Sequence, residues 1–144
     1  MIDANGDYLL VLTFSNTLTN VGGVSVTNGA GAATGNIDSN DAHNYVVNLT
    51  GVTNAQVTTV SLSNVADSAG DFSSAVSTSI AVLIGDVNAN RLVDGNDVSA
   101  VQSQTRQPVS SANFRYDVNA NGLIDGNDVS ITQGQTRTSL PSSP

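Results

Sequence analysis

The sequence predicts a mainly β sandwich over residues 1–85, joined to a small α-helical pair of loop–helix units over residues 86–138 and followed by an extended tail over residues 139–144. Three observations support this division. The first part alternates β-branched runs with Gly and Asn turns. The second part contains one phrase twice, DVNANRLVDGND from Asp86 and DVNANGLIDGND from Asp117, each followed by a helix-compatible run. The tail contains two prolines, which are incompatible with a helix.

The strands of the first domain are predicted from short runs rich in Val, Thr, Leu and Ile. Turns such as Asn5-Gly6 and Asn28-Gly29 separate the runs, and their spacing favours a sandwich. The core is predicted where apolar side chains alternate along a strand and therefore share one face. The predicted strands are 8–15, 23–28, 33–37, 44–50, 58–65 and 74–84, and the predicted core residues are Tyr45, Val47, Leu49, Val76, Thr78, Ile80, Val82 and Ile84.

The runs YLLVLTFSNTLT, YVVNLTGVTNAQVTTVSLSNV and SIAVLIGDVN make residues 8–86 similar to bacterial immunoglobulin-like domains that precede calcium-binding modules in secreted proteins. The resemblance implies an immunoglobulin-like sandwich. Such domains usually have one more strand before the run that starts here at Tyr8, where this chain offers only MIDANGD. The sandwich is therefore expected to lack one strand and to expose an edge that a partner's strand can fill. The alternatives are that it closes without that strand, or that the chain is a piece of a longer protein.

Both copies of the repeated phrase carry side-chain oxygens at positions 1, 3, 5, 9 and 12, as an EF-hand calcium loop does, and position 7 of such a loop contributes a backbone carbonyl. Calcium takes six to eight oxygen neighbours, and alternate residues of a tight loop can point successive oxygens at one centre. Two matches in one register predict two calcium ions. The predicted ligands are Asp86, Asn88, Asn90, Leu92, Asp94 and Asp97 in the first loop and Asp117, Asn119, Asn121, Leu123, Asp125 and Asp128 in the second.

The net charge of −8 comes from twelve Asp against four Arg, and six of these Asp lie in the two phrases. Each predicted site has three carboxylates and no His or Cys nearby, which favours calcium over a transition metal and suggests affinities suited to extracellular calcium levels. An acidic chain repels nucleic acid and anionic membranes, and its longest apolar run is too short to cross a bilayer. Neither nucleic-acid binding nor membrane insertion is therefore predicted.

The tandem phrases, their DVNxN openings and Asp in place of Glu at position 12 resemble the type I dockerin over residues 85–138. The helices are predicted at 98–106 and 129–137. Val98 and Val101 of the first can meet Val129 of the second, which gives a slight core that bound calcium must help to stabilise.

Two departures from the loop and family patterns carry expectations. Position 6, where the loop turns sharply, is Gly122 in the second loop but Arg91 in the first. A non-Gly residue with positive φ costs about 1 kcal/mol, so the first site is predicted to be the weaker one. Dockerins recognise cohesin partly through positions 10 and 11, and Gly95-Asn96 and Gly126-Asn127 replace the usual small hydroxyl pair there. This argues against ordinary cohesin binding.

No catalytic constellation is visible, because His43 lies in a turn-like stretch without a recognisable nucleophile motif. The sequence therefore predicts a non-enzymatic, extracellular or cell-surface, calcium-binding structural protein. The main hypothesis is a subunit of a head-to-tail assembly or filament, formed with copies of itself through strand complementation. The alternative is the C-terminal dockerin module of a larger secreted enzyme or adhesin, which anchors it to a cohesin-bearing scaffold or cell surface. In a simpler interpretation calcium only stabilises the fold of a connecting module and regulates nothing.

Overall fold

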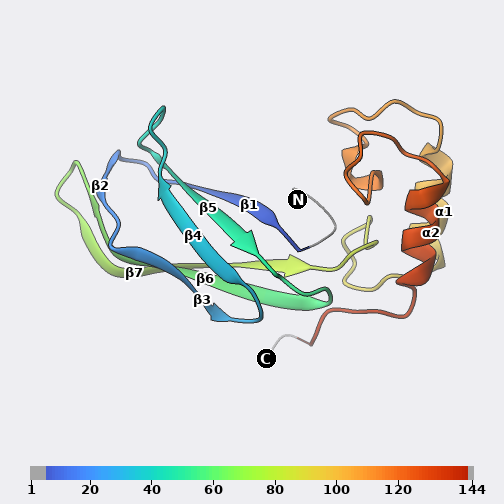
Figure 1. Ribbon diagram of the computed structural model, residues 1–144, viewed down its shortest axis with the longest axis horizontal. Helices are drawn as coiled ribbons and strands as arrows, with labels where there is room; N and C mark the ends of the chain where they lie inside the picture. Colours follow the sequence, from blue (N-terminus) through green and yellow to red (C-terminus); the bar gives the residue numbers. More distant parts are fainter. Residues whose placement is uncertain (1–5, 143–144) are drawn as a thin grey trace. The chain divides into compact units, whose positions relative to one another are not determined.

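The structure is a computed structural model and describes residues 6–142. Over these residues the chain forms two compact units, one containing 6–53 and 57–80 and the other containing 54–56 and 81–142. The first unit is a β-sandwich, and the second contains two short α-helices (Figure 1). The predicted fold class, a β-sandwich plus a small helical pair, is confirmed.

The sandwich consists of two antiparallel sheets. The first sheet has the order β1-β5-β4, with β1 (Tyr8–Thr13), β5 (Asn44–Thr50) and β4 (Ala32–Ile37). The second sheet is centred on β6 (Gln56–Asp67), which pairs with β2 (Leu18–Asn20), β3 (Gly23–Asn28) and β7 (Phe72–Val82). The sequence predicted six of these seven strands and missed β2. That strand has only three residues and is defined by its pairing with Ala66 and Asp67, far away in the sequence.

The core lies between the sheets and is centred on β5 and β6. Tyr45, Val47 and Leu49 are buried, as their alternation predicted. In β6 the alternate residues Thr58, Val60 and Leu62 are at most 1 % exposed. These two strands are central in their sheets, so that each has neighbours on both sides as well as an opposing sheet.

The predicted core face of β7 is only partly correct. Val82 is buried, but Val76 and Ile80 are half-buried and Thr78 is exposed. Ile84 lies beyond the end of β7 at Val82, and it packs on the core cluster of the second unit. The alternation along the strand was right. The burial was wrong because β7 pairs with β6 alone among the described strands, so one side of it lacks a neighbour.

Gly35 in β4 makes room for the ring of Tyr45 in the neighbouring strand. A Cβ at position 35 would lie 2.6 Å from Tyr45 Cε1 and 2.6 Å from the Val46 carbonyl oxygen. The ring is buried, and this burial raises the pKa of the Tyr45 phenol. The absence of a side chain at position 35 therefore lets this aromatic side chain enter the core.

Gly35→Ala is expected to destabilise the sandwich by about 1–3 kcal/mol, because the added methyl group overpacks a site closed by backbone. The matched control is Gly23→Ala in β3, where the added Cβ would meet its nearest atom, Ser63 Oγ, at an ordinary 3.5 Å. Urea denaturation of both variants measures the difference. Equal midpoints for the two variants would show that Tyr45 does not depend on Gly35.

The second unit contains α1 (Gly95–Gln104), a 3₁₀ turn η1 (Phe114–Tyr116) and α2 (Gly126–Gly134), and α1 lies against α2 (Figure 1). Both helices start and end about three residues earlier than predicted, because an Asp side chain immediately before each one caps its first turn. The core has few members. One cluster consists of the buried residues Val87, Val101, Val118 and Ile124, and the partly buried neighbours that pack on it include Val129, Ile131 and Tyr116. Val93 is also buried. Of the predicted contact residues, Val101 and Val129 join this cluster and Val98 is half-buried.

Candidate metal centre

The first loop, residues 86–97, is held by its own polar side chains. The carboxylate of Asp86 accepts the backbone N–H groups of Asn90 at 3.0 Å and Arg91 at 2.8 Å. The Oδ1 atom of Asn88 accepts the N–H of Asn90 at 3.0 Å, and the Oδ1 atom of Asn90 accepts the N–H of Leu92 at 2.9 Å. These bonds tie the side chains at positions 1, 3 and 5 to the backbone of the loop.

Asp97, at position 12, closes the same loop from the first turn of α1. One carboxylate oxygen accepts the N–H groups of Val87 at 3.1 Å and Asn88 at 3.3 Å, and the other accepts the N–H of Asp94 at 2.9 Å. Asp94 in turn caps the helix by accepting the N–H of Asn96 at 2.7 Å, which completes a capping box. Asp97 is fully buried. Its charge is therefore held inside the unit by hydrogen bonds from the beginning and the end of the loop.

The second loop, residues 117–128, repeats the backbone-to-side-chain bonds of this network. Asp117 accepts the N–H groups of Asn121 and Gly122 at 3.0 and 2.8 Å. Asp128, also fully buried, accepts those of Val118, Asn119 and Asp125 at 2.8, 3.3 and 2.9 Å. The largest difference between the loops is in the bond to position 2, 3.1 Å in the first and 2.8 Å in the second. The repeated phrase thus gives the same local structure twice.

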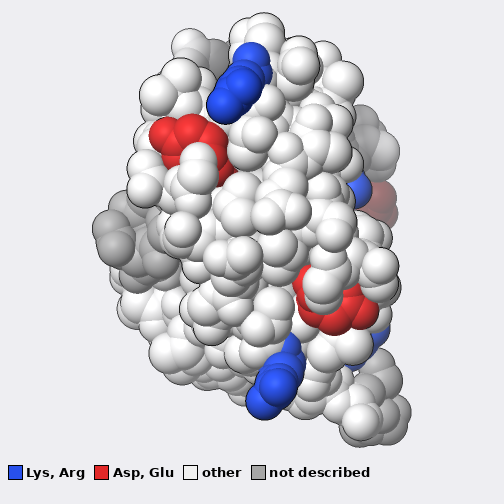
Figure 2. Space-filling view, turned by 90° about the vertical axis from the view of Figure 1, so that its right-hand side faces the viewer, with Lys and Arg blue, Asp and Glu red and all other residues white. Residues whose placement is uncertain are grey.

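The donor groups in each loop suit a hard cation. They are three carboxylates, two Asn amide oxygens and the backbone carbonyl of position 7, all of which are oxygen ligands of the kind that calcium prefers. Among the described residues, no three carboxylate, imidazole or thiolate groups gather closely enough to hold a metal by themselves. A calcium ion in either loop would therefore also need the amide and backbone oxygens. Figure 2 shows two acidic patches on one face, each with an arginine beside it.

The loops turn at two positions with a left-handed backbone. At position 6, Arg91 has φ of 75° and Gly122 has φ of 87°. At position 4, Ala89 and Ala120 have φ of 61° and 56°, which the sequence analysis missed because Ala carries no signal for this conformation. The first loop thus contains one more strained non-Gly residue than the second.

Gly122→Ala is expected to destabilise the second unit by about 1 kcal/mol, because Ala disfavours positive φ although a Cβ there meets no atom within 4 Å. Arg91→Gly should remove the same cost from the first loop. It also removes the hydrogen bond from the Arg91 guanidinium to the Pro141 carbonyl at 2.9 Å, so Arg91→Ala is the control that loses only this bond. Thermal unfolding in calcium measures all three variants. If Arg91→Gly is no more stable than Arg91→Ala, the backbone argument is wrong.

The tail packs on the first loop. The N–H of Val93 donates to the Thr138 carbonyl at 2.9 Å, and the N–H of Leu140 donates to the Arg91 carbonyl at 3.0 Å. Leu92 and Ser139 form an antiparallel bridge, which corresponds to the bridge of Leu123 with Pro108 in the second loop. The segment that follows each helix therefore pairs with the loop of the other repeat. Ser143 and Pro144 lie outside the described residues.

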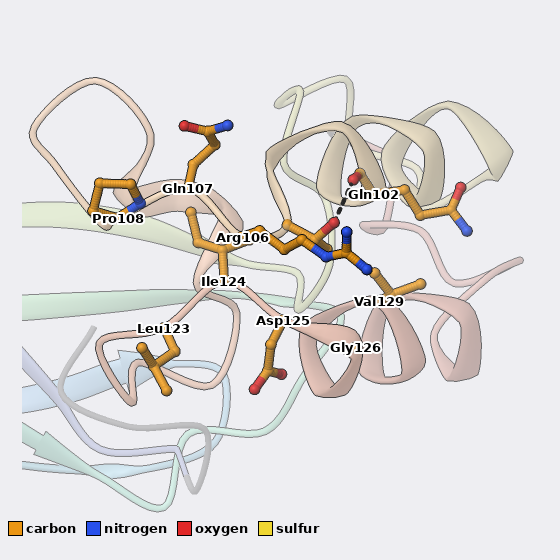
Figure 3. Close-up of a pocket in the computed structure, with 10 residues that line it drawn as sticks. Gln102, Arg106, Gln107, Pro108, Leu123, Ile124, Asp125, Gly126 and Val129 are labelled. Atoms are coloured by element: carbon orange, nitrogen blue, oxygen red, sulfur yellow. Dashed lines mark hydrogen bonds between the residues drawn. The ribbon is translucent and has the colours of Figure 1, made fainter.

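A groove of about 770 Å³ lies beside the second loop. The exposed side chain of Leu123 and the side chain of Pro108 flank it, and Arg106 extends across it toward Val129 (Figure 3). The exposed pair Gly126-Asn127 lies at the start of α2, and Gly126 lines the same groove. This groove and the exposed loop positions give the second unit an apolar surface with a cationic side chain next to it.

His43 forms hydrogen bonds within its own turn, to the side chain of Asp41. Its Nδ1 atom lies 2.8 Å from Asp41 Oδ1, and its backbone N–H donates to the same oxygen at 3.1 Å. The side-chain hydrogen bond, followed by the backbone one, lowers the pKa of the Asp41 carboxyl. This histidine therefore stabilises the turn before β5.

Among the described residues no helix is long and apolar enough to cross a membrane.

Comparison with known families gives a match for part of the second unit. Residues 84–133 match the model of the dockerin type I domain. The resemblance inferred from the two loops is thereby confirmed for this segment. No curated protein shows a significant match to the chain.

Proposed function

We propose that the second unit is a calcium-loaded docking module that binds a cohesin-like domain of another protein. The matching backbone-to-side-chain bonds of the two loops carry this proposal, because a duplicated loop followed by a capped helix is the arrangement that type I dockerins share. The surface that would meet the partner includes the apolar groove beside Leu123 and Arg106. Such modules occur in secreted and cell-surface proteins, so we place this chain outside the cell.

Each loop is proposed to hold one calcium ion, through the side chains at positions 1, 3, 5, 9 and 12 and the backbone carbonyl of position 7. The proposed ligands are those predicted from the sequence, Asp86, Asn88, Asn90, Leu92, Asp94 and Asp97, and Asp117, Asn119, Asn121, Leu123, Asp125 and Asp128. The exposed side chains of Leu92 and Leu123 agree with a role for their backbone oxygens alone. The ions would neutralise carboxylates that are crowded into twelve residues.

Isothermal titration with calcium and binding to an immobilised type I cohesin domain test this proposal together. We expect two ions per chain, one ion for Asp117→Ala, and cohesin binding that chelator abolishes. Asn48→Ala, an exposed position in β5, is the control and should leave both readouts unchanged. Two bound ions without cohesin binding would retain the metal sites and reject this partner.

A second candidate function is a structural subunit that associates with copies of itself, by accepting a neighbour's strand at the sandwich. The observation that favours it is the edge strand β7, which has β6 as its one partner among the described strands. Negative-stain electron microscopy in calcium and in chelator tests the head-to-tail form of this idea. Filaments in calcium that disperse in chelator would support it, and dispersed particles in both conditions would reject it.

A further inference from the structure

The side of the sandwich formed by β1 and β7 is open. In the first sheet β1 and β4 are the outer strands, and β4 lies beside β3 of the second sheet. The opposite side therefore consists of β1 and β7. Among the described strands β7 pairs only with β6, so its outer edge presents unpaired backbone N–H and C=O groups to solvent.

The β7 edge has none of the features that usually protect an edge strand. Its sequence, FSSAVSTSIAV, contains no charged residue, no proline and no glycine in 11 residues. Natural edges are commonly short or contain Lys, Pro or a bulge, because an uncharged extended edge pairs readily with another strand. The other outer strands are shorter, because β1, β3 and β4 have 6 residues each and β2 has 3. The longest outer strand, β7, thus lacks the features that prevent pairing with a strand of another chain.

The inner face of β7 is also incompletely covered. Ser77 and Ser79 hydrogen-bond to Ser61 and Thr59 of β6, at 3.0 and 2.8 Å, which places these residues on the outer face. The alternate residues, Val76, Thr78 and Ile80, therefore face the opposing sheet. They are half-buried or exposed, whereas Val60 and Leu62 beside them in β6 are at most 1 % exposed.

The apolar surface continues to the start of the strand. Phe72 is 66 % exposed, and a groove of about 170 Å³ is lined by Phe14, Leu18, Phe72 and Val76 together with Asp67 and Asp71, among others. Apolar side chains that lie on the core side of a strand and still meet water are a surface that association can bury. The uncovered surface follows β7, the strand with the free edge.

We propose that the occupant of this edge is β7 of a second copy, paired antiparallel across a two-fold axis. Two uncharged strands bring no like charges together, and antiparallel pairing with inner faces in register places Val76 and Ile80 of both copies on one side of a continuous sheet. Every described strand already belongs to a sheet, so none of them is left over as a donor. The inference rests on the second candidate function, self-association, and specifies its contact.

The proposed contact has a consequence for assembly. A two-fold contact uses the same surface on both copies and therefore closes as a dimer, whereas a head-to-tail contact propagates. Pairing through β7 alone gives dimers, and growth into a filament requires a different surface. The oligomer size thus separates this contact from head-to-tail strand complementation.

Sedimentation equilibrium of the full chain in calcium tests the proposal. We expect a monomer–dimer equilibrium, and we expect Thr78→Lys to raise the dimer dissociation constant at least tenfold, because it places a charge on each copy near the axis. Thr34→Lys, an equally exposed threonine on β4, is the control and should leave the constant unchanged. An equimolar mixture of Thr78→Lys and Thr78→Glu should recover the dimer. A monomeric parent at high micromolar concentration, or a mixture that stays monomeric, would overturn the proposal.

Cysteine substitution gives a second readout that does not depend on a charge. The chain contains no cysteine, so any disulfide in Ser74→Cys, Ser77→Cys or Thr78→Cys reports a contact between copies. Oxidation should cross-link the position nearest the axis and leave Thr34→Cys monomeric, since a disulfide requires Cα atoms within about 7 Å. Calcium titration of the same variants should match the parent. Loss of calcium binding would count against the docking module, whereas absent cross-links with normal calcium binding would count against the β7 contact alone.

Discussion

Chelation of calcium is expected to unfold the second unit and to leave the sandwich folded. The core of the second unit is small: Val87, Val101, Val118 and Ile124 form its one described cluster, Val93 is also buried, and the chain has no cysteine to cross-link it. Asp97 and Asp128 are fully buried, and a bound cation would offset the cost of burying their charges. Binding free energy is folding free energy for a module of this kind.

The expected size of this effect follows from mass action. A ligand at a hundred times its dissociation constant stabilises the folded state by about 2.7 kcal/mol, so two calcium sites together contribute about 5 kcal/mol. Small domains have total stabilities of about this size. Removing both ions should therefore shift most of the population of the second unit to the unfolded state.

Circular dichroism and calorimetry test this expectation together. In chelator the helical signal should disappear, and one of two calorimetric transitions should remain at its original temperature. Magnesium should restore less of the helical signal than calcium does, because magnesium demands a tighter octahedral site. A helical signal that is the same in chelator and in calcium would show that the second unit folds without metal.

Asp128→Ala is expected to destabilise the second unit by about 3–5 kcal/mol, because it removes a buried charged acceptor from three backbone N–H groups. Asp97→Ala should cost about the same, since Asp97 accepts the equivalent three bonds in the first loop. Asp128→Asn should cost less, because its amide oxygen can still accept the N–H groups of Val118 and Asn119. If these carboxylates also bind calcium, their removal lowers the stability of the second unit further.

The matched control is Asn127→Ala, at the exposed neighbouring position, which should change stability by less than about 0.5 kcal/mol. Thermal unfolding of each variant at saturating calcium gives the values. An Asp128→Ala variant within about 1 kcal/mol of the parent would show that Asp128 does not close the loop, and would also remove the main support for its proposed role as a ligand.

The loop networks could be predicted from the sequence because their determinants are local. The side chains that wind each loop lie within five residues of the N–H groups that they accept, and Asp97 and Asp128 reach back at most ten residues. Twelve residues of the right types therefore specify the structure with little help from the rest of the chain. The strands β3 and β5 were predicted to the residue for a similar reason, because Gly and Asn turns bound short β-branched runs.

Other features depend on pairing between distant parts of the chain, which no local pattern encodes. The strand β2 exists because Leu18 and Asn20 pair with Asp67 and Ala66. The tail has an extended sequence, but only the folded unit shows that residues 138–140 pair with the first loop. The sequence around Gly35 does not indicate that the ring of Tyr45 packs against this glycine.

The sequence by itself determined the two duplicated loops, the dockerin resemblance of residues 84–133 and the sandwich class of the first unit, because each follows from side-chain chemistry or alternation within a dozen residues. The tertiary structure decided which alternating faces are covered. Thr78 and Val76 alternate like core residues but remain at least partly exposed, because β7 has one neighbour among the described strands and the opposing sheet covers its inner face only in part.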